Sequence, residues 1–145
     1  MVKGQWFPQG TDISLALSIR ETVFARGRDA LDDIAQQVVG YREETPVGTA
    51  RLWWQDGAFR LGDVGVLESF RQKGFGDLLV RLLLFKALTH HASRVELISP
   101  TETADFFARY GFAPIGETKM LISMSVRSED IALSHCGGGC SQREA

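Results

Sequence analysis

The spacing of apolar residues predicts an amphipathic helix near the amino terminus. Thr11 and Asp12 are N-cap residue types. They precede apolar positions that cover one helical face and a little more, namely Ile13, Leu15, Leu17, Ile19, Val23 and Phe24. We expect this helix to end near Ala25. Residues 25–33 are rich in glycine and charge, and their pattern fits either a loop or a short second helix.

Runs of β-branched and aromatic residues then predict three consecutive antiparallel strands. Pro46 and Gly48 are turn formers, and they predict a turn over residues 43–48. Asp56-Gly57 is a second turn signal, of the kind that closes tight hairpins. The expected result is a β-meander with strands over residues 36–42, 49–55 and 58–67.

The second half of the chain alternates helix and strand. Residues 75–90 are apolar on almost every side of a predicted helix, which indicates burial on more than one face. The order strand, helix, strand requires a right-handed crossover and a locally parallel strand pair, so the class is mixed α and β. The remaining elements expected are a strand at 94–99, a short helix at 104–110 closed by Gly111, and one or two strands within 114–126 with a bend at Gly116.

The composition is that of a globular domain. The chain has 145 residues, 44% of them hydrophobic and 23% charged, which suffices for one domain with its own core. A net charge of -2 without a lysine or arginine run argues against nucleic-acid and membrane partners. Residues 1–10 lack signal-peptide features, and the apolar stretch 78–88 is too short to span a bilayer. We expect a soluble, cytoplasmic protein.

The two cysteines of the chain lie near its carboxyl end. Cys136 and Cys140 cannot form a disulfide framework that crosslinks the core. Together with His135 they form an incomplete set of zinc ligands. We assign no metal site. We expect residues 1–127 to form the folded domain and residues 128–145 to form a flexible tail. A thiol-based or metal-responsive role for this tail stays open beside the simpler interpretation of incidental thiols.

Two glycines stand where a loop meets the long predicted helix. Gly74 and Gly76 lack a Cβ and would let an anion approach the first helical amides, which have no intrahelical acceptor and lie at the positive end of the helix dipole. Arg71 and Lys73 add positive charge beside them. The alternative is a simple tight turn. A Walker loop is excluded because Gly-Lys-Ser/Thr is absent, and a dinucleotide fingerprint because the third glycine is absent.

Two segments resemble the signatures of a known family. Residues 64–76, an apolar strand followed by Arg-Gln-Lys-Gly-Phe-Gly, are similar to the central motif of the GNAT superfamily of N-acetyltransferases. Residues 103–112 are similar to its second signature, a helix that ends in Gly-Phe. A resemblance to the ElaA-like branch of the superfamily rests on residues 19–24, 32–33 and 46–52.

This resemblance covers about residues 12–118 and implies a fold and a cosubstrate. The implied fold is of mixed α/β (α+β) class, with a mostly antiparallel sheet, a central parallel strand pair splayed around the coenzyme, and flanking helices. The implied cosubstrate is acetyl-CoA, with its pyrophosphate on the loop amides and its pantetheine arm paired with the preceding strand. The implied coenzyme contacts are Val64, Val66, Arg71, Gln72, Lys73, Gly74, Phe75, Gly76 and Phe107.

The groups that would move protons match the family less closely. The family often has a tyrosine acid at the position of Phe107, and a phenyl ring has no proton to give. Tyr110 is therefore the candidate acid, although it also fits a packing role, and Ser99 or water are other proton donors. The candidate bases are Glu68 and, as alternatives, Asp63 and Glu96.

The acceptor side is expected to include Arg20 and Trp53, with Arg20 as a ligand for a substrate carboxylate, although both residues also fit packing roles. The implied reaction is transfer of an acetyl group to a primary amine of a small molecule or peptide, by direct attack in a ternary complex. A homodimer is a further expectation from the family. The departure at Phe107 keeps a second hypothesis open, in which the domain is a non-catalytic acyl-CoA sensor.

Overall fold

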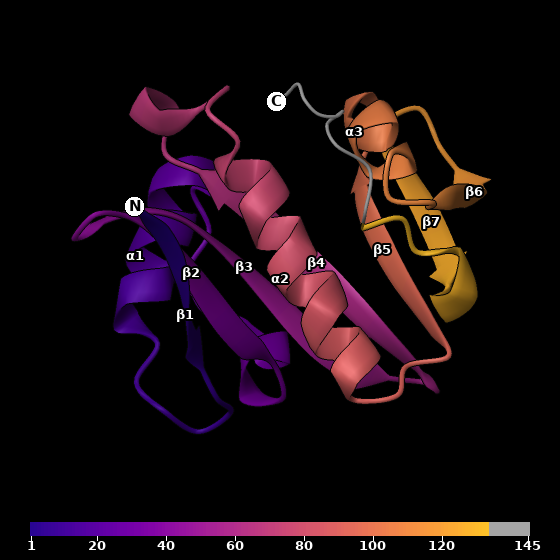
Figure 1. Ribbon diagram of the computed structural model, residues 1–145, viewed down its shortest axis with the longest axis horizontal. Coiled ribbons are helices and arrows are strands. Elements are labelled where there is room, and N and C mark those ends of the chain that lie inside the picture. Colours follow the sequence, from indigo (N-terminus) through magenta and orange to yellow (C-terminus); the bar gives the residue numbers. More distant parts are fainter. Residues whose placement is uncertain (134–145) are drawn as a thin grey trace. The chain divides into compact units, whose positions relative to one another are not determined.

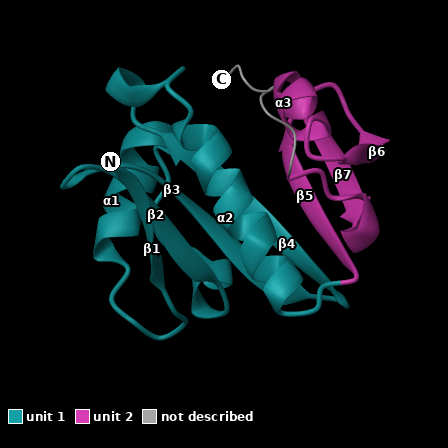
Figure 2. Ribbon diagram, in the orientation of Figure 1, with its two compact units in different colours: residues 1–92 teal, residues 93–145 magenta. Residues whose placement is uncertain are grey.

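The structure is a computed structural model that describes residues 1–133. It divides into two compact units, one comprising Met1–Ala92 and the other beginning at Ser93 (Figure 2). Every strand pairing described within either unit is antiparallel. No helix within residues 1–133 is long and apolar enough to cross a membrane.

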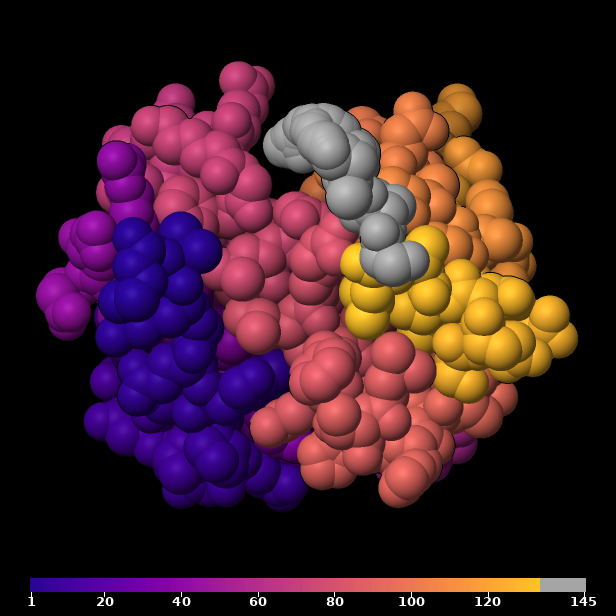
Figure 3. All heavy atoms as spheres, viewed as in Figure 1, coloured from indigo at the N-terminus to yellow at the C-terminus, as the bar shows by residue number. Residues whose placement is uncertain are grey.

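Unit 1 contains a four-stranded sheet in the order β1-β2-β3-β4 (Figure 1). The strands are β1 (Val2–Phe7), β2 (Gln36–Arg42), β3 (Thr45–Gln55) and β4 (Ala58–Val66). The predicted meander is confirmed, and so is its second turn, where Asp56 and Gly57 have φ values of 53° and 78°, as a primed hairpin turn requires. Strand β1 was not predicted. Its residues lie on the surface, where the space-filling view shows them in indigo (Figure 3).

Two helices cover opposite faces of this sheet. Helix α1 (Ser14–Phe24) packs Ala16 and Ile19 against Val39 of β2. A Cβ built on the neighbouring Gly40 would lie on the opposite face, because side chains alternate along a strand, and would be 3.4 Å from Leu79 of α2 (Phe75–Thr89). The all-round apolar pattern predicted for α2 is confirmed by its buried residues, Phe75, Leu79, Val80, Leu83, Leu84 and Ala87.

The predicted turn over residues 43–48 is wrong. The turn occupies Glu43 and Glu44 alone, with Glu43 at a φ of 54°, and β3 already begins at Thr45. Pro46 lies in the strand beside a register shift at Gly40/Tyr41, where an irregular ladder tolerates a residue without an amide hydrogen. Residues 25–33, which the pattern left undecided, form a loop followed by a short 3-10 helix, η1 (Ala30–Asp33).

Unit 2 is a three-stranded sheet in the order β5-β7-β6, formed by β5 (Arg94–Pro100), β6 (Ala113–Glu117) and β7 (Leu121–Arg127), together with α3 (Ala104–Ala108). Gly111 ends the α3 region with a φ of 101°, as predicted, and a Cβ there would lie 2.4 Å from the carbonyl oxygen of Asp130. Short 3-10 helices lie at Thr101–Thr103 and Ser128–Asp130, and the Ala132 amide donates to the Tyr110 carbonyl. His135, Cys136 and Cys140 lie outside the described residues.

Candidate functional site

The junction between β4 and α2 places the uncapped amino end of a helix beside an open space. After the 3-10 helix η2 (Glu68–Phe70), Gln72 and Gly74 adopt left-handed conformations, with φ values of 63° and 89°. Gly74 is the N-cap of α2, no side-chain cap is present, and the first intrahelical bond runs from the Leu78 amide to the Gly74 carbonyl. A Cβ built on Gly74 would meet nothing within 4 Å. This geometry is that of an anion site at a helix amino end.

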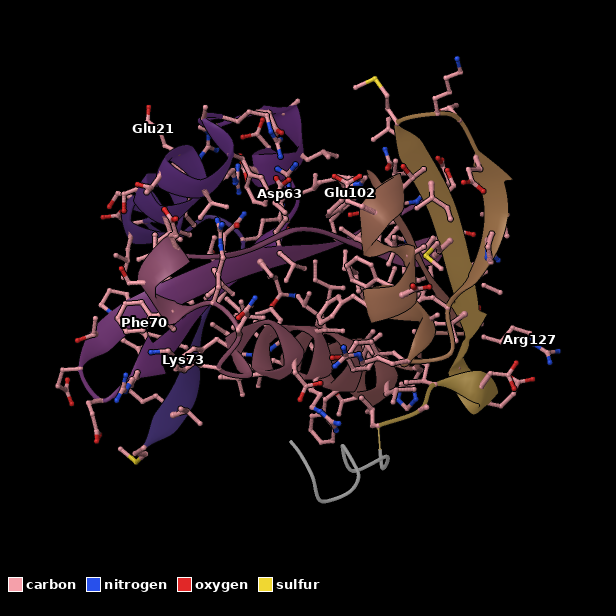
Figure 4. The ribbon with its side chains drawn as sticks, turned by 90° about the horizontal axis from the view of Figure 1, so that it is seen from above. Glu21, Asp63, Phe70, Lys73, Glu102 and Arg127 are labelled. Carbon is pink, nitrogen blue, oxygen red and sulfur yellow. The ribbon has the colours of Figure 1, made fainter. Side chains whose placement is uncertain are left out.

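The loop is anchored by an aromatic contact and carries its charges outside. Phe75 is buried and meets the Phe70 ring edge to face at 6.1 Å, whereas Arg71 and Lys73 are exposed. Nε of Arg71 donates to the Val66 carbonyl at 2.9 Å, which joins the loop to the end of β4. Figure 4 labels Phe70 and Lys73 beside the amino end of α2 (Figure 4). The loop therefore combines a fixed backbone with two accessible cations.

The end of β4 directs the backbone of Val66 away from β3. The Leu67 amide donates to the Val47 carbonyl at 2.8 Å. Antiparallel partners alternate between pairs that exchange hydrogen bonds and pairs that do not, so the next pair, Val66 with Gly48, is of the second kind. The amide and carbonyl of Val66 consequently point outward from the β3–β4 ladder, and the carbonyl meets Arg71 there. This is the direction that pairing with an extended ligand requires.

A β-bulge precedes this segment. Thr49 pairs with Gly65, but Arg51 pairs with Gly62, so Asp63 and Val64 together oppose the single residue Ala50. Asp63 has a φ of 51°, which for a residue with a Cβ costs about 1 kcal/mol. Interactions of the Asp63 side chain must offset this cost.

Beneath α1 lies an arginine–aspartate cluster made of Arg20, Arg26, Arg51, Asp29, Asp32, Asp63 and Gln37. Arg20 is 1% exposed, and its two terminal nitrogens each donate to an Asp32 oxygen at 2.8 Å. Arg51 is 4% exposed and holds Asp29 with both terminal nitrogens, at 2.7 and 3.0 Å. Gln37 bridges Arg20 and Asp32. Buried charges of opposite sign are thus brought together from helix, loop and sheet.

The arginines of the cluster lower the pKa of two of its carboxyl groups, Asp32 and Asp29. Burial by itself raises the pKa of Asp32, but hydrogen bonds from Arg20 and from the Asp29 amide outweigh it and hold that pKa well below the ordinary value of 3.8. The hydrogen bonds from Arg51 lower the pKa of Asp29. Burial lowers the pKa of Arg51, yet the bonded Asp29 carboxylate raises it further, so that this arginine stays protonated.

These pKa shifts predict that acid weakens the fold through Asp32. A carboxyl whose pKa is lower in the folded state stabilises the fold above the unfolded pKa of 3.8, and this contribution is lost as the pH falls below that value. Urea unfolding between pH 5 and pH 2.5 is expected to show a falling stability, with at most about 1.4 kcal/mol per pH unit from one carboxyl. Asp32→Asn should flatten the slope, whereas Asp33→Asn, at an exposed pair with Arg28, should not. Equal slopes in all three proteins would contradict the assignment.

The predicted catalytic residues lie in different units. Glu68 is exposed at the start of η2 in unit 1. In unit 2, Tyr110 is fully buried and Phe107 is 4% exposed, and both rings meet Phe106 edge to face. Glu96, an alternative base, pairs with Arg94 at 2.8 Å.

The two residues predicted for the acceptor side have internal partners. Arg20 is committed to Asp32, so the prediction that it holds a substrate carboxylate has no support in this geometry. Trp53 is half-buried, stacks under the Arg51 guanidinium at 5.3 Å and donates to Gln55. Trp54, the next residue along β3, is 53% exposed. Within residues 1–133, no group of three or more histidine, cysteine, aspartate or glutamate side chains is placed to hold a metal.

The interaction of Arg51 with Asp29 and Asp32 was not predicted from the sequence. The available signal was Arg51 itself, a charge inside the apolar strand segment Gly-Thr-Ala-Arg-Leu-Trp, and Arg20 inside an apolar helix. A charged residue on a buried face needs a partner of opposite sign. That rule would have predicted a carboxylate beneath both arginines, although not which one.

The fold is of mixed α and β class, and the β4–α2 junction has an uncapped, open helix amino end. The model of the acetyltransferase (GNAT) domain matches residues 33–114, more than half of the chain, and the protein belongs to this family. YjcF of Bacillus subtilis strain 168, an uncharacterized N-acetyltransferase, is 29% identical over 114 residues, which cover 73% of this chain and 81% of YjcF.

Solved structures share the fold. Escherichia coli ElaA matches with a TM-score of 0.76 and 22% identity, over 88% of this chain and 100% of ElaA. A GNAT family acetyltransferase from Elizabethkingia anophelis with acetyl-CoA bound matches with a TM-score of 0.69 and 14% identity, over 87% of this chain and 97% of that protein. The predicted GNAT-type fold class and the resemblance to ElaA are confirmed.

Proposed function

We propose that this protein transfers an acetyl group from acetyl-CoA to a primary amine of a small molecule or peptide, by direct attack of the amine in a ternary complex. The observation that carries the proposal is the uncapped amino end of α2, where Gly74 leaves its surroundings open and Arg71 and Lys73 are exposed beside it. Membership of the GNAT family supports the same reaction class, and a relative with acetyl-CoA bound supports the cosubstrate.

The residues of the loop would hold the pyrophosphate of the coenzyme, which supplies the activated acetyl thioester. Amides from Gln72 to Gly76 would donate to phosphate oxygens, and Arg71 and Lys73 would offset the charge. The outward backbone of Val64 to Val66 would pair with the extended pantetheine arm. The Val66 amide is placed by the β3–β4 register to donate outward, so it is our candidate donor to the thioester oxygen.

Glu68 is our candidate base, because its exposed carboxylate follows Val66 by two residues and could take a proton from the attacking amine, directly or through water. Tyr110 is our candidate acid for the departing thiolate. Its ring is fully buried, so solvent or Ser99 is the competing proton source. The phenyl ring of Phe107 would contribute only packing near the coenzyme.

The test is a calorimetric titration of the protein with acetyl-CoA and with CoA, followed by thiol release over a panel of amines, amino acids and peptides. We expect micromolar binding of both coenzymes and turnover of at least one amine. Absence of binding to either coenzyme would overturn the proposal.

The second candidate is a non-catalytic acyl-CoA sensor. It is favoured by Phe107 at the position of the usual tyrosine and by the complete burial of Tyr110. Binding of acetyl-CoA without turnover of any amine in the same assay would select this function over the first.

A further inference from the structure

The bulge in β4 determines which way Asp63 points. Gly62 lies opposite Arg51, and directly opposed residues share a face, so Gly62 is on the α1 side of the sheet. Gly65 is on that side too, since a Cβ there would lie 2.8 Å from the Phe24 ring. In an unbroken strand, residues three apart point to opposite faces. The extra residue of the bulge removes this conflict and lets Asp63 reach the α1 side.

On that side Asp63 meets three arginines. Its Oδ2 lies 3.1 Å from Nη2 of Arg51 and 3.6 Å from Nε of Arg20, and its Oδ1 pairs with Nη2 of Arg26. The side chain of Asp63 is 11% exposed and those of Arg20 and Arg51 are 1% and 5% exposed, so water screens these pairs weakly. Figure 4 labels Asp63 among side chains that end in nitrogen. The three arginines that pair with this carboxylate come from α1, from β3 and from the loop that follows α1.

Arginine nitrogens lie within ion-pair distance of both Asp63 oxygens, and the side chain is only 11% exposed, so this carboxylate is largely shielded from a substrate. It is well suited to anchor the backbone that carries it. Asp63 directly precedes Val64, and Val66 lies two residues further on, so any change in the bulge rotates the backbone groups of both.

We propose that Asp63 is a positioning residue for acyl transfer. Held by Arg51, Arg20 and Arg26, it fixes the bulge and thereby the direction in which the backbone of Val64 to Val66 faces the acyl group. This inference rests on the proposed function, in which those backbone groups contact the coenzyme. It assigns to the arginine–aspartate cluster a task in catalysis besides its contribution to folding.

The experiment compares Asp63→Asn, Asp63→Gly and Arg26→Met with the wild type. Asp63→Gly relieves the left-handed backbone but removes the anchor, and Arg26 is the one partly exposed arginine of the cluster, so that its loss spares the buried pairs. We expect kcat to fall about 10- to 100-fold in both Asp63 variants and several-fold in Arg26→Met. The Kd for CoA should rise by a smaller factor than kcat falls, because the loop at Gly74, which would hold the pyrophosphate, is unchanged in these variants. Asp33→Asn, an exposed carboxylate paired with Arg28, is the matched control and should keep the wild-type kcat.

A second readout needs no turnover. Amide chemical shifts and hydrogen exchange of Val64, Gly65 and Val66 should change in Asp63→Asn and stay as in the wild type in Asp33→Asn. Wild-type kcat in folded Asp63→Gly, or unchanged amide signals at these residues, would overturn the positioning role. If the proposed function is wrong, the wild type itself will turn over no amine. The amide signals would then still test whether Asp63 fixes the backbone of the bulge.

Discussion

Replacing Arg20 by methionine is expected to lower the free energy of unfolding by about 3–5 kcal/mol. Arg20 donates two hydrogen bonds to Asp32, whose side chain is fully buried, and a third to Gln37. Methionine fills a similar volume but donates no hydrogen bond. The Asp32 carboxylate then keeps its contacts with Arg51, Gln37 and the Asp29 amide. A buried carboxylate that loses its main partner bears most of its desolvation cost. Urea unfolding at pH 7 measures the effect.

The matched control is Arg28→Met. Arg28 also pairs with an aspartate, Asp33, but both side chains are more than half exposed, so this loss should cost at most about 1 kcal/mol. The double variant Arg20→Met/Asp32→Asn should lose less than the sum of its two single variants, because both remove the same interaction. A loss below about 1 kcal/mol in Arg20→Met would show that the cluster contributes little to folding.

Elements with a strong local pattern could be predicted from the sequence. The helix at residues 75–89 is apolar nearly all round, and this pattern indicates a helix that is buried on more than one face. The turn at Asp56-Gly57 was predictable because its residues tolerate positive φ. The left-handed Gly111 after α3 followed from the same reasoning.

Elements determined by distant partners could not be predicted. Strand β1 contains Lys3, Gly4 and Gln5, which favour no strand by themselves, and it forms because β2 pairs with it along its whole length. Pro46 suggested a turn, but the sheet accommodates it beside a bulge. Local preference is a weak guide where tertiary pairing decides the backbone.

The candidate site shows the same division. The loop at Arg71–Gly76 was visible because glycine, charge and a following helix stand next to one another in the sequence. The arginine–aspartate cluster was not visible as a unit, since Arg20 and Asp63 are 43 positions apart and meet only when α1 packs on the sheet. The bulge leaves only a weak signal in the sequence, because Gly62 and Asp63 are residue types depleted in strands but do not by themselves fix where the extra residue lies.

Replacing Gly74 by tryptophan is expected to raise the Kd for acetyl-CoA at least 100-fold. The indole would occupy the open space over the first amides of α2 and prevent phosphate oxygens from reaching them. Loss of two charge-assisted hydrogen bonds, at about 1.5–3 kcal/mol each, corresponds to a factor of this size. Isothermal titration calorimetry with acetyl-CoA and CoA measures it.

The structure offers a control for the strain that this substitution brings. Gly57 has a φ of 78°, close to the 89° of Gly74, and a Cβ there likewise meets nothing within 4 Å, but Gly57 lies in the hairpin turn between β3 and β4. Gly57→Trp should therefore cost about as much stability as Gly74→Trp, on the order of 1–2 kcal/mol, and leave the Kd unchanged. Equal loss of binding in both variants would show that strain in the fold causes the effect. Retained binding in Gly74→Trp would show that the coenzyme does not bind at this loop.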